Sequence, residues 1–200
     1  MSEEKITENI NIAIFASGAG SNVQKIIDHF RDHPTIAIKL IVCNKEGAGV
    51  LSIAKKEHIA SLMIDKERFF RGDAFVADLK AYAIDFIVLA GFLWKIPVKL
   101  IQAYPDKIIN IHPALLPKYG GKGMYGGFVH AAVIAAKEKE SGITIHYVDE
   151  IYDHGGVIFQ ASCMVDTTDT PETLAKKIHA LEHLHYPGVV EEVVKLRNRR

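Results

Sequence analysis

Apolar residues alternate between two spacings along the first half of the chain, and this alternation constrains the fold more than any other sequence feature. Short continuous runs rich in Ile and Val are typical of strands buried on both faces, and apolar residues three and four positions apart are typical of crossover helices. The predicted strands span residues 11–17, 36–44, 60–64, 85–91 and 107–112, and the predicted helices span residues 21–33, 49–58, 73–84 and 98–104. The pattern predicts an α/β fold with a mostly parallel, twisted sheet flanked by helices.

The pattern changes after Pro117, where a glycine-rich loop covers residues 120–127. The expected elements beyond it are a helix at 130–140, strands at 142–149 and 155–165, and a long helix at 171–196 with Thr170 as its N-cap. The two strands show more alternation and fit an antiparallel C-terminal part of the sheet. No repeat and no linker interrupts the chain, so residues 1–200 are expected to form one domain.

Charge and cysteine content exclude several classes of protein. Lys plus Arg and Asp plus Glu both number 24, so no charge excess points to nucleic acid or to an anionic membrane. Cys43 and Cys163 lie in apolar segments, as reduced thiols do in cytosolic proteins. The acidic N-terminus lacks the apolar run of a signal peptide, and no segment has the ~18 uninterrupted apolar residues of a membrane span. A soluble, cytoplasmic protein is therefore expected.

The first glycine-rich loop, Ser17–Asn22, lies between the first predicted strand and the first predicted helix. Free backbone N–H groups and the helix dipole favour an anion there, and a small phosphate ester is the predicted ligand. A dinucleotide is not favoured, because Val23 stands where its fingerprint needs a third glycine and Asn44 stands where a ribose-binding acid is expected. The alternative is a simple turn in which Ser21 or Asn22 caps the helix.

Asn110 and His112 stand at the end of the fifth predicted strand, immediately before Pro113. Strand side chains alternate between faces, so both project to the same side, near the carboxyl edge where open α/β sheets bind ligands. An amide beside an imidazole suits an oxyanion on an acyl carbon, and the histidine is also able to move a proton. The alternative is structural, with Asn110 satisfying turn backbone and His112 a hydrogen-bonded boundary residue. No other histidine has a convincing metal-ligand spacing with His112, so no metal is expected.

A histidine that is to be protonated near neutral pH benefits from an adjacent carboxylate. The loop between the two predicted C-terminal strands offers Asp149, Glu150 and Asp153. Asp153 is the best candidate because the glycines that follow it let the backbone come close, although spacing alone does not choose among the three. His146 either approaches the same site or packs in the core.

Five motifs spread over nearly the whole chain resemble those of the formyltransferase family, and in particular the folate-dependent phosphoribosylglycinamide formyltransferases of purine biosynthesis. The motifs are GAGSN at 18–22, VLAGF at 88–92, NIHPALLPKY at 110–119, DHGGVI at 153–158 and EHLHYP at 182–187. The resemblance implies a Rossmann-like formyltransferase fold. In this fold a nucleotide-binding half at about 10–110 overlaps a folate-binding and catalytic half at about 85–196.

The resemblance also implies an activity, which is transfer of the formyl group of 10-formyltetrahydrofolate to the amine of glycinamide ribonucleotide. Asn110, His112 and Asp153 are then the catalytic set. The implied partners are the ribonucleotide and the folate, with no metal, nucleic acid or membrane, and the implied state is a monomer or homodimer.

The same resemblance assigns two sets of binding residues. The ribonucleotide set is Gly20, Ser21, Asn22 and Glu182. The folate set is Leu93, Trp94, Lys95, Ile96, Asn110, Asp149, Glu150, Ile151, Tyr152 and Asp153. Arg71 is left outside both sets, and the loop 120–127 is either a mobile cover or a passive turn.

Three other functions stay open at this point. A formyltetrahydrofolate hydrolase uses the same amide, histidine and carboxylate. A methionyl-tRNA formyltransferase needs a second, RNA-binding domain and a basic surface, and neither is evident in the sequence. A catalytically silent nucleotide-binding module would use the phosphate loop alone.

Overall fold

The computed structural model describes residues 9–197, so the ends of the expected domain, residues 1–8 and 198–200, lie outside the described part. The strands in this part are β1 (Ile10–Ala16), β2 (Ile36–Cys43), β3 (Ala60–Met63), β4 (Phe86–Leu89), β5 (Ile108–His112), β6 (Glu140–Tyr147) and β7 (Val157–Met164). The helices are α1 (Ser21–Phe30), α2 (Gly49–Lys56), α3 (Lys66–Arg71), α4 (Val76–Ala81), α5 (Val98–Ala103), α6 (Gly127–Ala135) and α7 (Pro171–Arg197). None of these helices combines the length and the hydropathy needed to cross a membrane.

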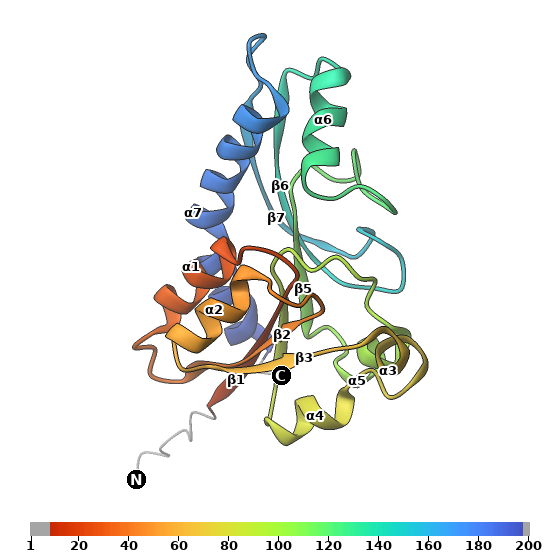
Figure 1. Ribbon diagram of the computed structural model, residues 1–200. Helices are drawn as coiled ribbons and strands as arrows, with labels where there is room; N and C mark the ends of the chain where they lie inside the picture. The colour runs from red at the N-terminus through yellow and green to blue at the C-terminus, as the bar shows by residue number, and fades with distance from the viewer. Residues whose placement is uncertain (1–8, 198–200) are drawn as a thin grey trace.

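The strands form one seven-stranded sheet in the order β3-β2-β1-β4-β5-β6-β7 (Figure 1). All pairings among β1 to β5 are parallel. The pairings of β5 with β6 and of β6 with β7 are antiparallel. The predicted mostly parallel sheet with an antiparallel C-terminal part is therefore confirmed.

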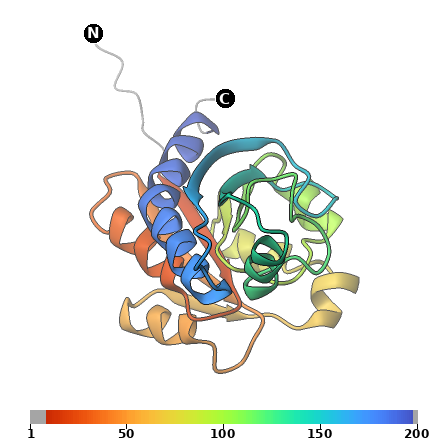
Figure 2. The same cartoon turned by 90° about the horizontal axis from the view of Figure 1, so that it is seen from above.

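Helices cover both faces of the sheet, which explains why the central strands are apolar throughout. In β1, Ile12 and Ile14 belong to the core beneath α1, α2, α6 and α7, whereas Ala13 and Phe15 belong to the core beneath α3, α4 and α5. The view from above shows the long helix α7 lying alongside α1, against which it packs (Figure 2). Burial of successive side chains on opposite faces is the physical basis of the continuous apolar runs.

Helix α3 is absent from the sequence prediction. It is only six residues long, too short to show a repeating apolar spacing, and it begins where the Asp65 side chain accepts a hydrogen bond from the backbone N–H of Arg68 at 2.9 Å. The helix predicted at 73–84 is the shorter α4. It starts at Val76 because its N-cap Phe75 has a left-handed backbone, with φ of 58°.

The helix predicted at 130–140 is displaced in the structure. α6 begins three residues earlier, at Gly127, and it ends at Ala135 because Lys137 has a φ of 53° and Glu140 already pairs in β6. The predicted start of the last helix is confirmed, since the backbone N–H of Thr173 donates to the Thr170 hydroxyl at 3.3 Å.

The strand order changes direction between β1 and β4, which is where open α/β sheets bind ligands at their carboxyl edge. The predicted phosphate-binding loop follows β1, and the predicted folate segment follows β4. The backbone N–H of Ser17 donates to the Gly91 carbonyl at 3.1 Å, and the N–H of Leu93 donates to the Ser17 hydroxyl at 3.0 Å. The topology thus joins two predicted binding segments directly.

Candidate active site

A cleft of about 890 Å³ opens at this edge of the sheet. Its walls come from the loops after β1 and β4, the end of β5, the glycine-rich loop 120–127, the β6–β7 loop and one side of α7. Every residue predicted to bind substrate or to act in catalysis lines this cleft except Glu150, which is exposed to solvent. Arg71, the last residue of α3, does not line it either.

The loop after β1 and the start of α1 form one wall of the cleft. α1 begins at Ser21 with Gly20 as its N-cap, and Gly20 has a φ of 84°. A Cβ at this position would lie 2.9 Å from the side chain of Ile53 and 3.1 Å from the backbone of Val50, so the loop requires glycine. The alternative reading, in which Ser21 or Asn22 caps the helix, is wrong. The uncapped N-terminus suits an anion.

Glu182 on α7 lies against this wall and is only 5% exposed. One of its oxygens, Oε2, accepts hydrogen bonds from Nδ2 of Asn22 at 2.8 Å and from Nδ1 of His179 at 2.9 Å. The bond to Glu182 raises the pKa of His179 above its ordinary value. Both donors use the same oxygen, and no hydrogen bond to the other carboxylate oxygen occurs among the described residues.

Tyr186 lies one helical turn beyond Glu182 and is fully buried. Its hydroxyl donates to the carbonyl oxygen of Leu89, the last residue of β4, at 2.9 Å. Burial raises the pKa of Tyr186 well above its usual value, so the hydroxyl stays a donor. The bond ties α7 to the sheet where the strand order changes and thereby holds Glu182 over the cleft.

His112 has an acceptor at each ring nitrogen. Nε2 donates to the carbonyl oxygen of Tyr119 at 2.8 Å, and Nδ1 lies 3.6 Å from the carboxylate of Asp153. His112 therefore lies between a main-chain carbonyl oxygen and the Asp153 carboxylate.

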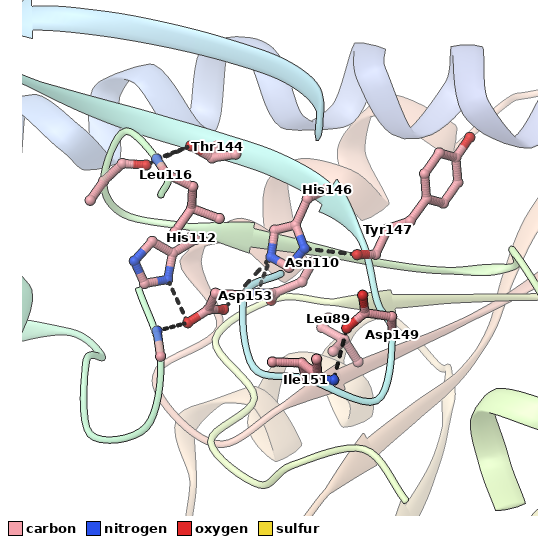
Figure 3. Close-up of polar contacts among 12 residues, drawn as sticks. Leu89, Asn110, His112, Leu116, Thr144, His146, Tyr147, Asp149, Ile151 and Asp153 are labelled. Atoms are coloured by element: carbon pink, nitrogen blue, oxygen red, sulfur yellow. Dashed lines mark hydrogen bonds and ion pairs between the residues drawn. The ribbon is translucent and has the colours of Figure 1, made fainter. Parts of the chain in front are cut away.

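The carboxylate of Asp153 lies between the glycine-rich loop and two histidines (Figure 3). Its Oδ2 accepts the backbone N–H of Gly121 at 2.9 Å and faces His112, while its Oδ1 lies 3.7 Å from Nε2 of His146. The backbone of Asp153 has a φ of 53°, a conformation that aspartate tolerates better than most residues. The fold thus brings Asp153, from the loop between β6 and β7, to Asn110 and His112 at the end of β5.

His146 belongs to the site, which settles the choice that the sequence left open. It pairs with Asn110 across β5 and β6. Its Nδ1 lies 2.8 Å from the carbonyl oxygen of Tyr147 and donates to it, so Nε2 of the neutral ring accepts from Nδ2 of Asn110 at 3.1 Å. Burial lowers the pKa of His146 and favours this neutral form. One N–H of the Asn110 amide is fixed by the bond, and the other remains available to a ligand.

The segment Leu93–Ile96 forms a further wall of the cleft. The Trp94 ring packs against Phe69 of α3, with ring centroids 5.7 Å apart, and against Phe92, at 6.3 Å. The ammonium group of Lys95 lies 5.6 Å from the centroid of the Tyr152 ring on the β6–β7 loop. The unpredicted helix α3 therefore supports the predicted folate segment.

Three further residues that line the cleft, Lys45, His130 and His179, lie outside the sequence prediction. Lys45 comes shortly after the end of β2, just as the predicted phosphate-binding loop comes directly after β1. His179 lies three residues before Glu182 on the same helix. The sequence positions of both residues therefore pointed to the cleft. His130 lies in an apolar helical stretch and had none. Residues 9–197 contain no group of three or more His, Cys, Asp or Glu side chains suited to a metal ion.

The sequence matches the family model for formyl transferases over residues 10–190. It is 39% identical over 192 residues to the phosphoribosylglycinamide formyltransferase of Bacillus subtilis (strain 168), a match that covers 94% of this chain and 96% of the relative. It is 42% identical over 196 residues to the chloroplastic phosphoribosylglycinamide formyltransferase of Arabidopsis thaliana, covering 93% of this chain and 67% of the relative. The crystal structure of phosphoribosylglycinamide formyltransferase from Bacillus halodurans superposes with a TM-score of 0.82 at 36% identity, covering 93% of this chain and 94% of the other. The chain therefore belongs to the formyl transferase family.

Proposed function

We propose that this enzyme transfers the formyl group of 10-formyltetrahydrofolate to the amine of glycinamide ribonucleotide. The observation that carries the proposal is the convergence of Asn110, His112 and Asp153 in a cleft that also contains an uncapped helix N-terminus. The bacterial and plant relatives named phosphoribosylglycinamide formyltransferase support the choice of substrate. The proposal includes a single domain over residues 1–200, a cytoplasmic location and a monomer or homodimer.

The two substrates are assigned to different walls of the cleft. The phosphate of the ribonucleotide binds at Gly20–Asn22, where backbone N–H groups and the α1 dipole favour an anion, with Lys45 nearby to add positive charge. The ribose hydroxyls donate to the remaining oxygen of Glu182. The folate ring binds between the segment 93–96 and the loop 149–153, and the glycinamide arm then extends toward His112.

The reaction is a direct acyl transfer. The amine attacks the formyl carbon, and the carbonyl oxygen becomes an oxyanion that accepts the free N–H of Asn110. Nδ1 of His112 supplies a second donor, because 3.6 Å is too long for a strong hydrogen bond to Asp153. The carbon–nitrogen bond to the folate then breaks. The amine gives up one proton and the folate nitrogen gains one, and Asp153 and His112 are the groups that move protons between them.

The test is steady-state kinetics with glycinamide ribonucleotide and 10-formyltetrahydrofolate, following the deformylated folate. Asn110→Ala and His112→Ala are each expected to lower kcat by about 10²- to 10³-fold, the usual loss when one preorganised oxyanion donor is removed. His29→Ala is the control, because His29 pairs with Glu191 away from the cleft.

Two outcomes would contradict the proposal. Near-native kcat in both cleft variants would remove Asn110 and His112 from the chemistry. Formate release by the wild-type enzyme without any ribonucleotide, at a rate equal to that with it, would identify a hydrolase instead.

A further inference from the structure

His130 is a buried polar side chain that lacks a partner. It lies in the first turns of α6, it is 3% exposed, and its Nδ1 has no hydrogen-bond partner among residues 9–197. A buried polar group left in this state costs roughly 1–3 kcal/mol, and most such groups in folded proteins are satisfied. The packing of the protein alone therefore does not account for a histidine at this position.

The position of His130 in the fold indicates where a hydrogen-bond partner for its ring would come from. The ring lines the cleft, and α6 packs against α7, the helix that carries His179 and Glu182. The ionisable groups that act on His130 are His179 and Glu182 of the ribonucleotide wall and the catalytic His112. His130 is therefore within electrostatic reach of both the proposed ribose-binding carboxylate and the reaction centre.

The chemical state of His130 follows from its surroundings. Burial, reinforced by the positive charge of His179 and His112 and opposed by Glu182, lowers the pKa of His130. Near neutral pH the imidazole is uncharged and offers one hydrogen-bond donor and one acceptor. Such a ring pairs well with an amide, which also has one group of each kind.

We infer that the His130 imidazole binds the glycinamide arm of the ribonucleotide and positions its amine for attack. This inference rests on the proposed function, because that arm is the part of the substrate that must lie between Glu182 and His112. A neutral ring has an advantage here over a charged one. A carboxylate at this position would stabilise the protonated amine, which has no lone pair for the attack, and a cation would repel the positive charge that develops on the nitrogen as it bonds to the formyl carbon.

The decisive variant is His130→Leu, which removes both nitrogens and keeps a similar volume. The KM for the ribonucleotide is expected to rise about tenfold, as loss of one hydrogen bond to a desolvated substrate group predicts, while the KM for the folate stays within about twofold. Thermal stability should be unchanged or higher, because the variant removes an unsatisfied buried group. His130→Asn, which retains a donor and an acceptor, should recover part of the ribonucleotide affinity.

His185→Leu serves as the matched control, because His185 packs on Phe159 and does not line the cleft. Calorimetry with the ribonucleotide alone gives a second readout that does not depend on turnover. An unchanged ribonucleotide affinity in His130→Leu would overturn the inference while leaving the proposed function intact. So would a loss of stability together with equal increases in both KM values, which indicates a structural role. A wild-type enzyme that neither binds nor formylates the ribonucleotide would reject both proposals.

Discussion

The substitution Asp153→Asn tests the coupling between the carboxylate and His112. It removes one negative charge but keeps an oxygen that can accept the Gly121 N–H, so the loop should hold its conformation. The backbone φ of 53° at this position is one that asparagine also adopts readily. The change is therefore close to a pure deletion of charge.

The magnitude follows from the distance. Two unit charges 3.6 Å apart attract by about 4.6 kcal/mol at an effective dielectric constant of about 20. Both side chains are largely buried, with 4% and 12% exposed, so bulk water screens the pair only weakly. Taken as an upper limit, this energy corresponds to about 2,000-fold in rate, and a fall in kcat of about 10²- to 10³-fold is expected.

The assay is a double-mutant cycle with His112→Ala, measured as kcat. Because the two residues act as one unit, the double variant should lose little more activity than either single variant. Asp106→Asn is the matched control, since Asp106 also has a left-handed backbone, with φ of 56°, but an exposed side chain outside the cleft. Fully additive losses would refute the coupling, and so would native kcat in Asp153→Asn.

Two further predictions concern α7. Glu182→Gln should raise the KM for the ribonucleotide at least about tenfold and leave the KM for the folate unchanged. Proton NMR should show that His179 titrates at a lower pH in this variant than in the wild type. The folded-state pKa of His179 is raised, so its bond to Glu182 adds stability that is fully present below about pH 6.5 and is lost as pH rises through the raised value. The stability difference between wild type and variant should therefore shrink as pH rises above about 6.5. Urea unfolding checks this, and a constant difference would contradict it. Tyr186→Phe should lose about 1 kcal/mol of unfolding free energy, measured in the same way, because the Leu89 carbonyl loses its buried donor. Unchanged stability would show that this bond is not stabilising.

The sheet could be predicted from the sequence because its central strands are buried on both faces. Burial on two faces forces the continuous apolar runs from which β1, β2 and β4 were located. Helix boundaries were less predictable because they depend on single backbone angles. Lys137, for example, ends α6 because its backbone is in the left-handed conformation, and neither its charge nor its sequence neighbours predict that conformation.

Some residues of the candidate site could likewise be predicted from the sequence, and others could not. Asn110 and His112 could be predicted because alternation along one strand places both on one face. The role of His146 could not, because its contact with Asn110 depends on the register between β5 and β6, which the sequence of neither strand encodes alone. His130 reaches the cleft only through the packing of α6 on α7, and that is a property of the assembled fold.

The short segment Tyr119–Gly121 holds the histidine and the carboxylate from two sides, through the Tyr119 carbonyl and the Gly121 amide. A shift of these three residues would therefore disturb His112 and Asp153 simultaneously. One stretch of main chain therefore supports both side chains, and a substitution that displaces it should weaken both contacts together.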